Sequence, residues 1–179
     1  MLITRIALVS ALAAGTTVSA LAQTPVVAQD ANPLIASSKI LFNNSKNDVV
    51  KSVDKVSDDL WNWRPTPKVR TFGELFAHIA DGQYEFCGAA IEGKSVDKEI
   101  EKTAKTKAAV VEALNAAFAY CEAAYSKLND KNAAEMVTFG RPMTRIGVMD
   151  FNVAHNMEHY GNLVTYMRLK DIVPPTSKQ

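Results

Sequence analysis

The stretch Asn152–Tyr166, NVAHNMEHYGNLVTY, is the most informative part of this 179-residue chain. It reads as one helix, and its two histidines, His155 and His159, are four positions apart. Side chains at that spacing share one helix face, with Cβ atoms about 5–6 Å apart, so the two imidazoles could bind one metal ion. The third histidine, His78, lies in another helical segment, FGELFAHIADGQYEF. A shared site requires the fold to bring His78 opposite the pair.

Hydrophobic periodicity places all three histidines on apolar helix faces. The last helix is expected to begin after Thr144, a usable N-cap, and to run to about Lys170. Near one face it carries Val148, Phe151, His155, His159, Leu163 and Tyr166. The helix containing His78 is expected to begin with a capping box between Thr71 and Glu74 and to end near Glu92. Its apolar face carries Leu75, His78, Ile79, Gly82, Phe86 and Ala89.

Two further amphipathic helices complete the expected fold. One runs from near Pro33, behind Asn32 as a cap, to Leu60, and the other from about Lys105 to Leu128. The connections are expected to be a proline-containing segment (61–70) covering one end of the core, a charged segment (93–104) and an irregular crossover (129–143). No convincing strand pair is found. The sequence therefore predicts an all-α four-helix bundle over residues 33–175, followed by a short tail, 176–179.

The N-terminus reads as a secretory signal. Residues 1–22 begin with Arg5, continue through an apolar stretch and end in Ala20-Leu21-Ala22, a small-x-small cleavage pattern. A buried N-terminal helix is the alternative, but Thr, Ser and Gly interrupt any apolar stripe. Residues 23–32 are expected to form a flexible tether. The sequence therefore predicts an exported protein, periplasmic or secreted.

Charge and hydropathy exclude two classes of partner. The net charge is +1, and cleavage would remove one arginine and no acid, leaving 19 basic and 19 acidic residues. Without a basic cluster, no nucleic-acid partner is expected. Beyond the leader, no stretch approaches the roughly 20 apolar residues that span a bilayer, so no stable membrane insertion is expected after cleavage.

Cys87 and Cys121 are expected on different helices. Export would permit a disulfide between them. The alternative is two small buried side chains, because free cysteine packs well in a core, and this alternative is the one favoured. Cys87 lies nine positions after His78, about half a turn off its face, and is a poor fourth ligand.

Three histidine nitrogens would leave coordination positions for water or substrate, which is typical of a catalytic zinc site rather than a structural one. Glu158 and Asp81 are candidates for orienting a ligand. Asn152 and Asn162, each three residues outside the histidine pair, are candidates for contacting a metal-bound water or the substrate. No residue stands out as a general base, and Glu158 and Asp81 are the only candidates named for that role.

Three segments resemble the DinB-like superfamily: RPTPKVRTFGEL, AHIADGQYEFC and HNMEHYGNLVTYMRLKDIVPP. The resemblance covers about Pro33 to Pro175. It implies a four-helix bundle with a metal-binding histidine triad in a cleft, often as a homodimer, and makes His78, His155 and His159 the ligands. Characterised relatives include thiol-dependent transferases and isomerases that act with bacillithiol or mycothiol. The present chain departs from them in its expected export, since those thiols are chiefly cytoplasmic.

The leading functional hypothesis is an exported metal-dependent enzyme, hydrolase- or transferase-like, that acts on a small molecule. The ion would be Zn²⁺, with Ni²⁺, Mn²⁺ or Fe²⁺ as alternatives. A rival hypothesis is a non-catalytic, metal-stabilised bundle that serves as a binding or interaction module. A third is a metal-free bundle with three core histidines.

Overall fold

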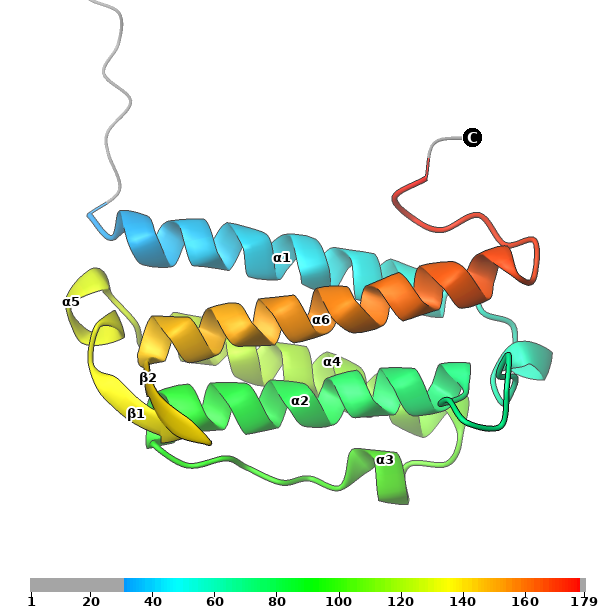
Figure 1. Cartoon of the computed structure of the whole chain (residues 1–179), viewed down its shortest axis with the longest axis horizontal. Helices are drawn as coiled ribbons and strands as arrows, with labels where there is room; N and C mark the ends of the chain where they lie inside the picture. The colour runs from blue at the N-terminus through cyan, green and yellow to red at the C-terminus, as the bar shows by residue number, and fades with distance from the viewer. Residues whose placement is uncertain (1–30, 178–179) are drawn as a thin grey trace, which may run out of the picture.

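The computed structural model describes residues 31–177 and shows an elongated helical bundle with a small hairpin at one end (Figure 1). The long helices are α1 (Pro33–Val53), α2 (Phe72–Glu92), α4 (Lys107–Tyr125) and α6 (Arg145–Arg168). The short elements are η1 (Asp58–Leu60), α3 (Ile100–Thr103), α5 (Asp130–Ala133), β1 (Met136–Phe139) and β2 (Arg141–Thr144). The helical prediction is confirmed for this part of the chain. The predicted signal peptide and most of the predicted tether lie outside it.

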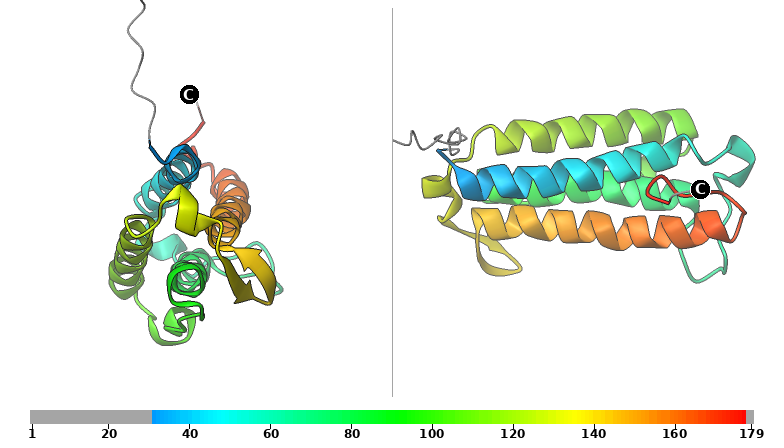
Figure 2. Two further views of the ribbon diagram at one scale, coloured as in Figure 1. Left: turned by 90° about the vertical axis from the view of Figure 1, so that its left-hand side faces the viewer. Right: turned by 90° about the horizontal axis from the view of Figure 1, so that it is seen from above.

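The helices form two pairs that run in opposite directions. α1 and α6 lie side by side and parallel, whereas α2 and α4 run the other way (Figure 1). Figure 2 shows the four helices end-on around a common core. Because α2 and α4 are parallel, the connection between them returns along the whole bundle. This connection carries α3 to the first half of α2, where His78 lies.

Apolar faces predicted from helical periodicity make up the core. Phe42 of α1 is fully buried and packs against Phe118 and Tyr125 of α4, with ring centroids 6.0 and 5.0 Å apart. Burying one such ring contributes about 1.5–3 kcal/mol. Within residues 31–177, no helix has the length and hydrophobicity needed to cross a membrane.

A disulfide joins Cys87 of α2 to Cys121 of α4, with Cα atoms 5.4 Å apart. The favoured alternative, two unbridged cysteines, is therefore wrong. Both side chains are completely buried, as expected, but the parallel packing of α2 and α4 sets them side by side. That adjacency depends on bundle topology, which the spacing of the two cysteines does not reveal.

The tryptophan-containing segment covers one end of the core, as predicted. Trp61 is buried and stacks on Phe76, with ring centroids 5.4 Å apart. Trp63 packs against Phe72 and meets the Tyr166 ring edge-on. Two backbone hydrogen bonds fix the segment to the start of α2, from Phe72 N to Trp63 O (3.1 Å) and from Gly73 N to Trp61 O (2.9 Å).

The end of α1 differs from the sequence expectation. α1 ends at Val53 rather than near Leu60, because tight backbone bonds from Lys55 to Ser52 and from Val56 to Val53 close its last turn. The following turn and η1 nevertheless bury Val56 and half-bury Leu60, which explains why the apolar spacing continues past the helix end.

The segment predicted as an irregular crossover contains α5 and an antiparallel hairpin of β1 and β2. The absence of a strand pair was therefore a wrong prediction. Gly140, with φ of 65°, forms the turn, a backbone conformation that glycine adopts at little cost. Phe139 and Met143 pack from the hairpin onto the core.

Candidate metal centre

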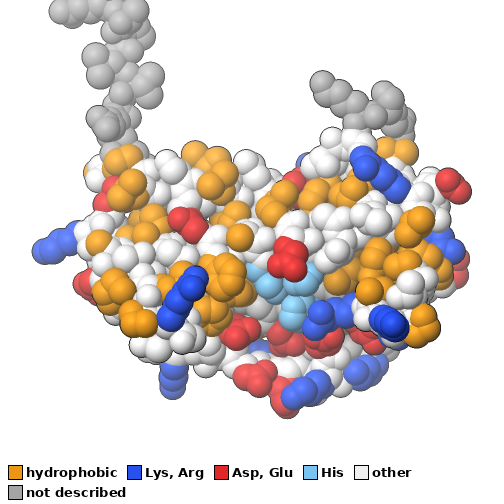
Figure 3. All heavy atoms as spheres, viewed as in Figure 1, with side chains coloured by type: hydrophobic (Ala, Val, Ile, Leu, Met, Phe, Trp, Pro, Cys, Tyr) orange, Lys and Arg blue, Asp and Glu red, His pale blue; other side chains and the backbone are white. Residues whose placement is uncertain are grey.

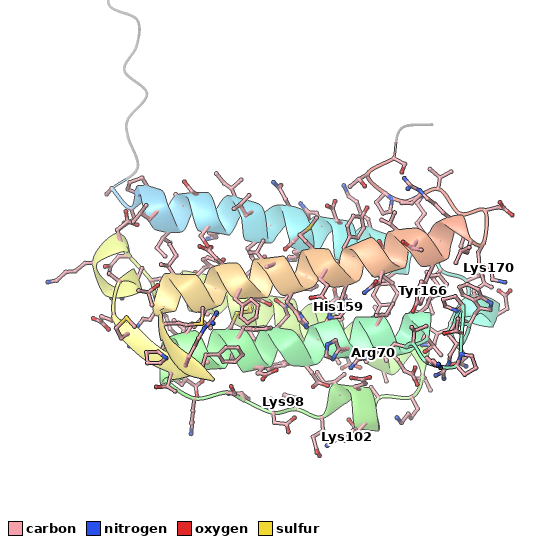
Figure 4. The ribbon with its side chains drawn as sticks, viewed as in Figure 1. Arg70, Lys98, Lys102, His159, Tyr166 and Lys170 are labelled. Atoms are coloured by element: carbon pink, nitrogen blue, oxygen red, sulfur yellow. A yellow bond between two sulfur atoms is a disulfide. The ribbon has the colours of Figure 1, made fainter. Side chains whose placement is uncertain are left out.

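The three histidines meet between α2 and α6. The predicted capping box fixes the start of α2: Thr71 Oγ1 accepts from Glu74 N (3.1 Å) and Glu74 Oε2 accepts from Thr71 N (2.8 Å). His78 follows on the side of α2 that packs against α6, where His155 and His159 lie. Figure 4 shows His159 in the space between the two helices, with Arg70 and Tyr166 nearby.

The Nε2 atoms of the three rings converge. His155 Nε2 lies 3.2 Å from His78 Nε2 and 3.1 Å from His159 Nε2. One ligand nitrogen from each ring falls within 4.8 Å of the others. Metal–nitrogen bonds of about 2.0–2.1 Å would place neighbouring nitrogens about 3.0 Å apart at octahedral angles and about 3.4 Å apart at tetrahedral angles. The group therefore could hold a metal ion, and its spacing does not distinguish among the candidate ions.

Gly82 provides the space that His155 occupies. A Cβ atom at this position would lie 2.7 Å from His155 Cε1 and 3.0 Å from His155 Nδ1. The space that this glycine leaves on α2 is thus filled by the imidazole that faces it from α6. His155 Nδ1 is buried and makes no hydrogen bond within residues 31–177. On this side its ring is held by packing against Gly82 and Phe86 rather than by a hydrogen bond.

Glu101 of α3 orients His78. Its Oε2 lies 3.2 Å from His78 Nδ1, while Arg70 donates to both carboxylate oxygens, from Nε at 2.7 Å and from Nη2 at 3.3 Å. Asp81 accepts from the backbone N–H groups of Ile100 and Glu101, each at 2.8 Å, and so fixes α3 beside α2. A carboxylate on Nδ1 holds the proton there and leaves the Nε2 lone pair free for a metal.

Replacing Glu101 by glutamine should lower the Zn²⁺ affinity of the protein by about 10- to 100-fold, the usual cost of losing such a partner. The amide keeps the side chain's size but removes the charge that favours a proton on His78 Nδ1. Competition with a chromophoric chelator measures this affinity. Glu99→Gln, on the same connection but paired with Lys102, is the matched control. Equal affinities for Glu101→Gln and wild type would contradict this role.

Burial keeps the histidines neutral. Burial, together with smaller effects of the neighbouring His159 and His78, lowers the pKa of His155 to about 3. Burial and His78 lower the pKa of His159 to about 4, against an opposing effect of Glu158. The pKa of His78 is also lowered, first by burial and then by Arg70, although Glu101 opposes this. All three rings therefore present lone pairs near pH 7, as metal binding requires.

The metal-free protein should lose stability as the pH falls from about 6.5 towards 3. Unfolded histidine takes up protons near pH 6.5, whereas folded His155 and His159 stay neutral down to about pH 3 and 4. Below pH 6.5 the unfolded state therefore binds more protons, which favours unfolding. Urea unfolding of chelator-stripped protein at several pH values measures this, with His159→Gln as the comparison. A wild-type slope no steeper than that of the variant would contradict these pKa shifts.

A cavity of about 560 Å³ opens beside the triad. His159, only 7% exposed, lines it together with Glu158, Asn162 and Tyr166 of α6 and with the loop before α2. Figure 3 shows the histidine side chains at the surface, bordered by both acidic and basic side chains. The triad is thus accessible from one side, and a small molecule has room next to it.

The other predicted residues lie in different surroundings. Glu158 is exposed at the cavity, and Asn162 Nδ2 lies 3.5 Å from His159 Nδ1. Asp81 binds the start of α3 and also opposes the lowering of the His78 pKa. Asn152 is buried in the core, where it donates to Gln83 Oε1 (2.8 Å) and lies 3.5 Å from Cys121 Sγ.

Sequence reasoning missed Glu101 and Arg70. Both belong to connections rather than to the helices that carry the histidines. The available signal was a carboxylate within a charged linker and an arginine just before a helix cap, and neither pattern identifies a partner across the fold.

Comparison with known proteins identifies a matching family and several similar structures. The family model described as the DinB superfamily matches residues 41–163. A DinB-like protein from Bacillus cereus has a similar structure, with a TM-score of 0.68 and 18% identity over 80% of this chain and 97% of its own. A DinB-like protein from Bacillus subtilis gives a TM-score of 0.62 and 20% identity over 78% and 92% of the two chains.

An uncharacterised protein from Escherichia coli has a TM-score of 0.62 and 8% identity over 77% of this chain and 95% of its own. No curated protein matches the sequence. The identities to the solved structures are low, so these likenesses show the fold alone. The family model covers well over half of the chain, and this protein therefore belongs to the DinB superfamily.

Proposed function

We propose that this protein is an exported metal-dependent enzyme that acts on a small molecule at a site held by His78, His155 and His159. The observation that supports it best is the convergence of three neutral Nε2 atoms beside a cavity of about 560 Å³. Three protein ligands would leave coordination positions open, and His159 lines the cavity beside the triad. This combination is typical of catalytic rather than structural metal sites.

A bound divalent ion would lower the pKa of a coordinated water or thiol and polarise a substrate oxygen. The residues of the chain supply the surroundings. Glu101 keeps the proton of His78 on Nδ1, and Gly82 leaves room for His155. Glu158 has a carboxylate at the cavity in reach of solvent, and it is the acid–base candidate there.

Zn²⁺ is the proposed ion, with Ni²⁺, Mn²⁺ or Fe²⁺ as alternatives. Export is supported by the leader-like pattern of residues 1–22 and by the disulfide, since disulfides persist in oxidising compartments. A homodimer is proposed from the family resemblance alone. The near-neutral charge supports a small-molecule substrate rather than a nucleic acid.

Open coordination can be tested with Co²⁺-loaded protein and a neutral added ligand, imidazole. An enzyme with an accessible ion should show a saturable change in its visible absorption spectrum as imidazole enters an open position. The non-catalytic alternative, a metal-stabilised bundle whose ion is closed to small molecules, predicts a spectrum that imidazole does not change. That second result, obtained with fully loaded protein, would overturn the enzyme proposal while leaving metal binding intact.

A further inference from the structure

We infer that the cavity beside His159 binds a small molecule through an oxyanion, either a carboxylate or a phosphate, held by Lys68 with Arg64 and Arg70. The remainder of the molecule would then face the histidines. This inference rests on the proposed function, because it names the class of substrate that the same site would take.

The basic side chains at the cavity come from one loop. Arg64, Lys68 and Arg70 all line it, within seven residues of the chain. Arg70 is paired with Glu101, and Arg64 Nη2 lies 3.6 Å from a Glu74 oxygen in a partly exposed pair. Lys68 is exposed and forms no ion pair within residues 31–177. Among the described residues, the loop therefore presents one positive charge without an ion-pair partner, on Lys68. The other two charges, on Arg64 and Arg70, already have carboxylate partners but could also contact a ligand.

The placement of these charges would be unfavourable in a site that held a cation alone. Three basic and three acidic side chains line the cavity, so a divalent ion on the triad would leave an excess of two positive charges. Like charges repel more strongly where water is partly excluded. The charge of Arg70 lies near enough to contribute to the lowered pKa values of all three histidines. An anion that contacted both the loop and the ion would remove this excess.

The loop is already ordered for binding. Lys68 N donates to Thr66 Oγ1 and Val69 N donates to Thr66 O, each at 3.3 Å. Arg64 Nη1 donates to Val69 O at 3.3 Å, and Tyr166 Oη donates to Arg70 O at 3.1 Å. These bonds, with Pro65 and Pro67 inside the loop, fix the backbone, so binding would not have to order it.

The chemistry of the loop selects the anion. Guanidinium and ammonium groups form their strongest hydrogen bonds with carboxylate and phosphate oxygens. The cavity of about 560 Å³ has the size of an ordinary small-molecule site. Glu158, on α6, would repel the anionic group and so direct it to the loop. A small carboxylate or phosphate ester fits both requirements.

Calorimetric titration of the Zn²⁺-loaded protein with acetate and with methylphosphonate tests this inference and separates the two oxyanions. Lys68→Gln should weaken binding of the preferred probe by about three- to tenfold, the range for a partly exposed charge-assisted contact. Arg64→Gln is a second variant of the same loop. Lys98→Gln is the matched control, since Lys98 lies over the Tyr84 ring, away from the loop (Figure 4). The affinity of this variant for the probe should equal that of wild type.

Binding of ion and anion should also be linked. Zn²⁺ should raise the affinity for the probe, and the probe should raise the affinity for Zn²⁺ by the same factor. Lys68→Gln should leave Zn²⁺ affinity undiminished when no probe is present. If loaded wild type binds neither oxyanion, or binds both no more tightly than acetamide, this inference fails while the metal proposal stands. If wild type retains no Zn²⁺, the proposed function itself fails.

Discussion

Replacing His155 by alanine is expected to lower the Zn²⁺ affinity of this protein by more than about 100-fold. Loss of a residue that only orients a ligand usually costs about 10- to 100-fold, so loss of a ligand should cost more. His155 is the ring whose Nε2 lies within 3.2 Å of both other Nε2 atoms, so its removal takes away the central one of three donors. Elemental analysis of purified protein, followed by chelator competition, measures the effect.

Met157→Ala is the matched control for this prediction, because Met157 is an exposed residue of the same helix. Its Zn²⁺ affinity should equal that of wild type. Gly82→Ala provides a second approach, since the added methyl group would push against the His155 ring without removing a donor. If wild type and His155→Ala carried equally little metal after loading, the three histidines would be ordinary core residues and the enzyme proposal would be wrong.

The sequence was sufficient to predict the triad. His155 and His159 share a face because helical spacing is fixed, and the capping box at Thr71 sets where α2 begins and therefore where His78 points. Both signals are local. The remaining step, the meeting of the three histidines in one cleft of a four-helix bundle, was predicted through the resemblance to a known family rather than from the residues themselves.

Features that depend on distant segments could not be predicted in the same way. Glu101 reaches His78 because parallel α2 and α4 require a long return connection, and Asp81 then holds that connection in place. The hairpin was missed because its strands are only four residues long, Gly140 forms the turn between them and Pro142 lies in β2, and both residue types are typical of irregular loops. Asn152 shares a helix with the triad but turns into the core.

Removing the disulfide is expected to lower the free energy of unfolding by about 4 kcal/mol. The bond closes a loop between residues 34 apart, and the loss of loop entropy in the unfolded chain accounts for a change of this size. The variant Cys87→Ala/Cys121→Ala removes the bond and leaves two small residues at fully buried positions. Urea unfolding followed by circular dichroism measures the difference from wild type.

Chemically reduced wild type serves as the control, because it lacks the bond but keeps both sulfur atoms. It should unfold at nearly the same urea concentration as the double variant, since cavities left by two cysteines are small. A loss below about 1 kcal/mol in both samples would mean that the cross-link adds little to a core already held by α2 and α4 packing.

Zn²⁺ affinity should change little in either sample, because the disulfide holds α2 to α4, whereas the triad joins α2 to α6. Parallel loss of stability and metal would instead show that the first half of α2 depends on the bond for its position.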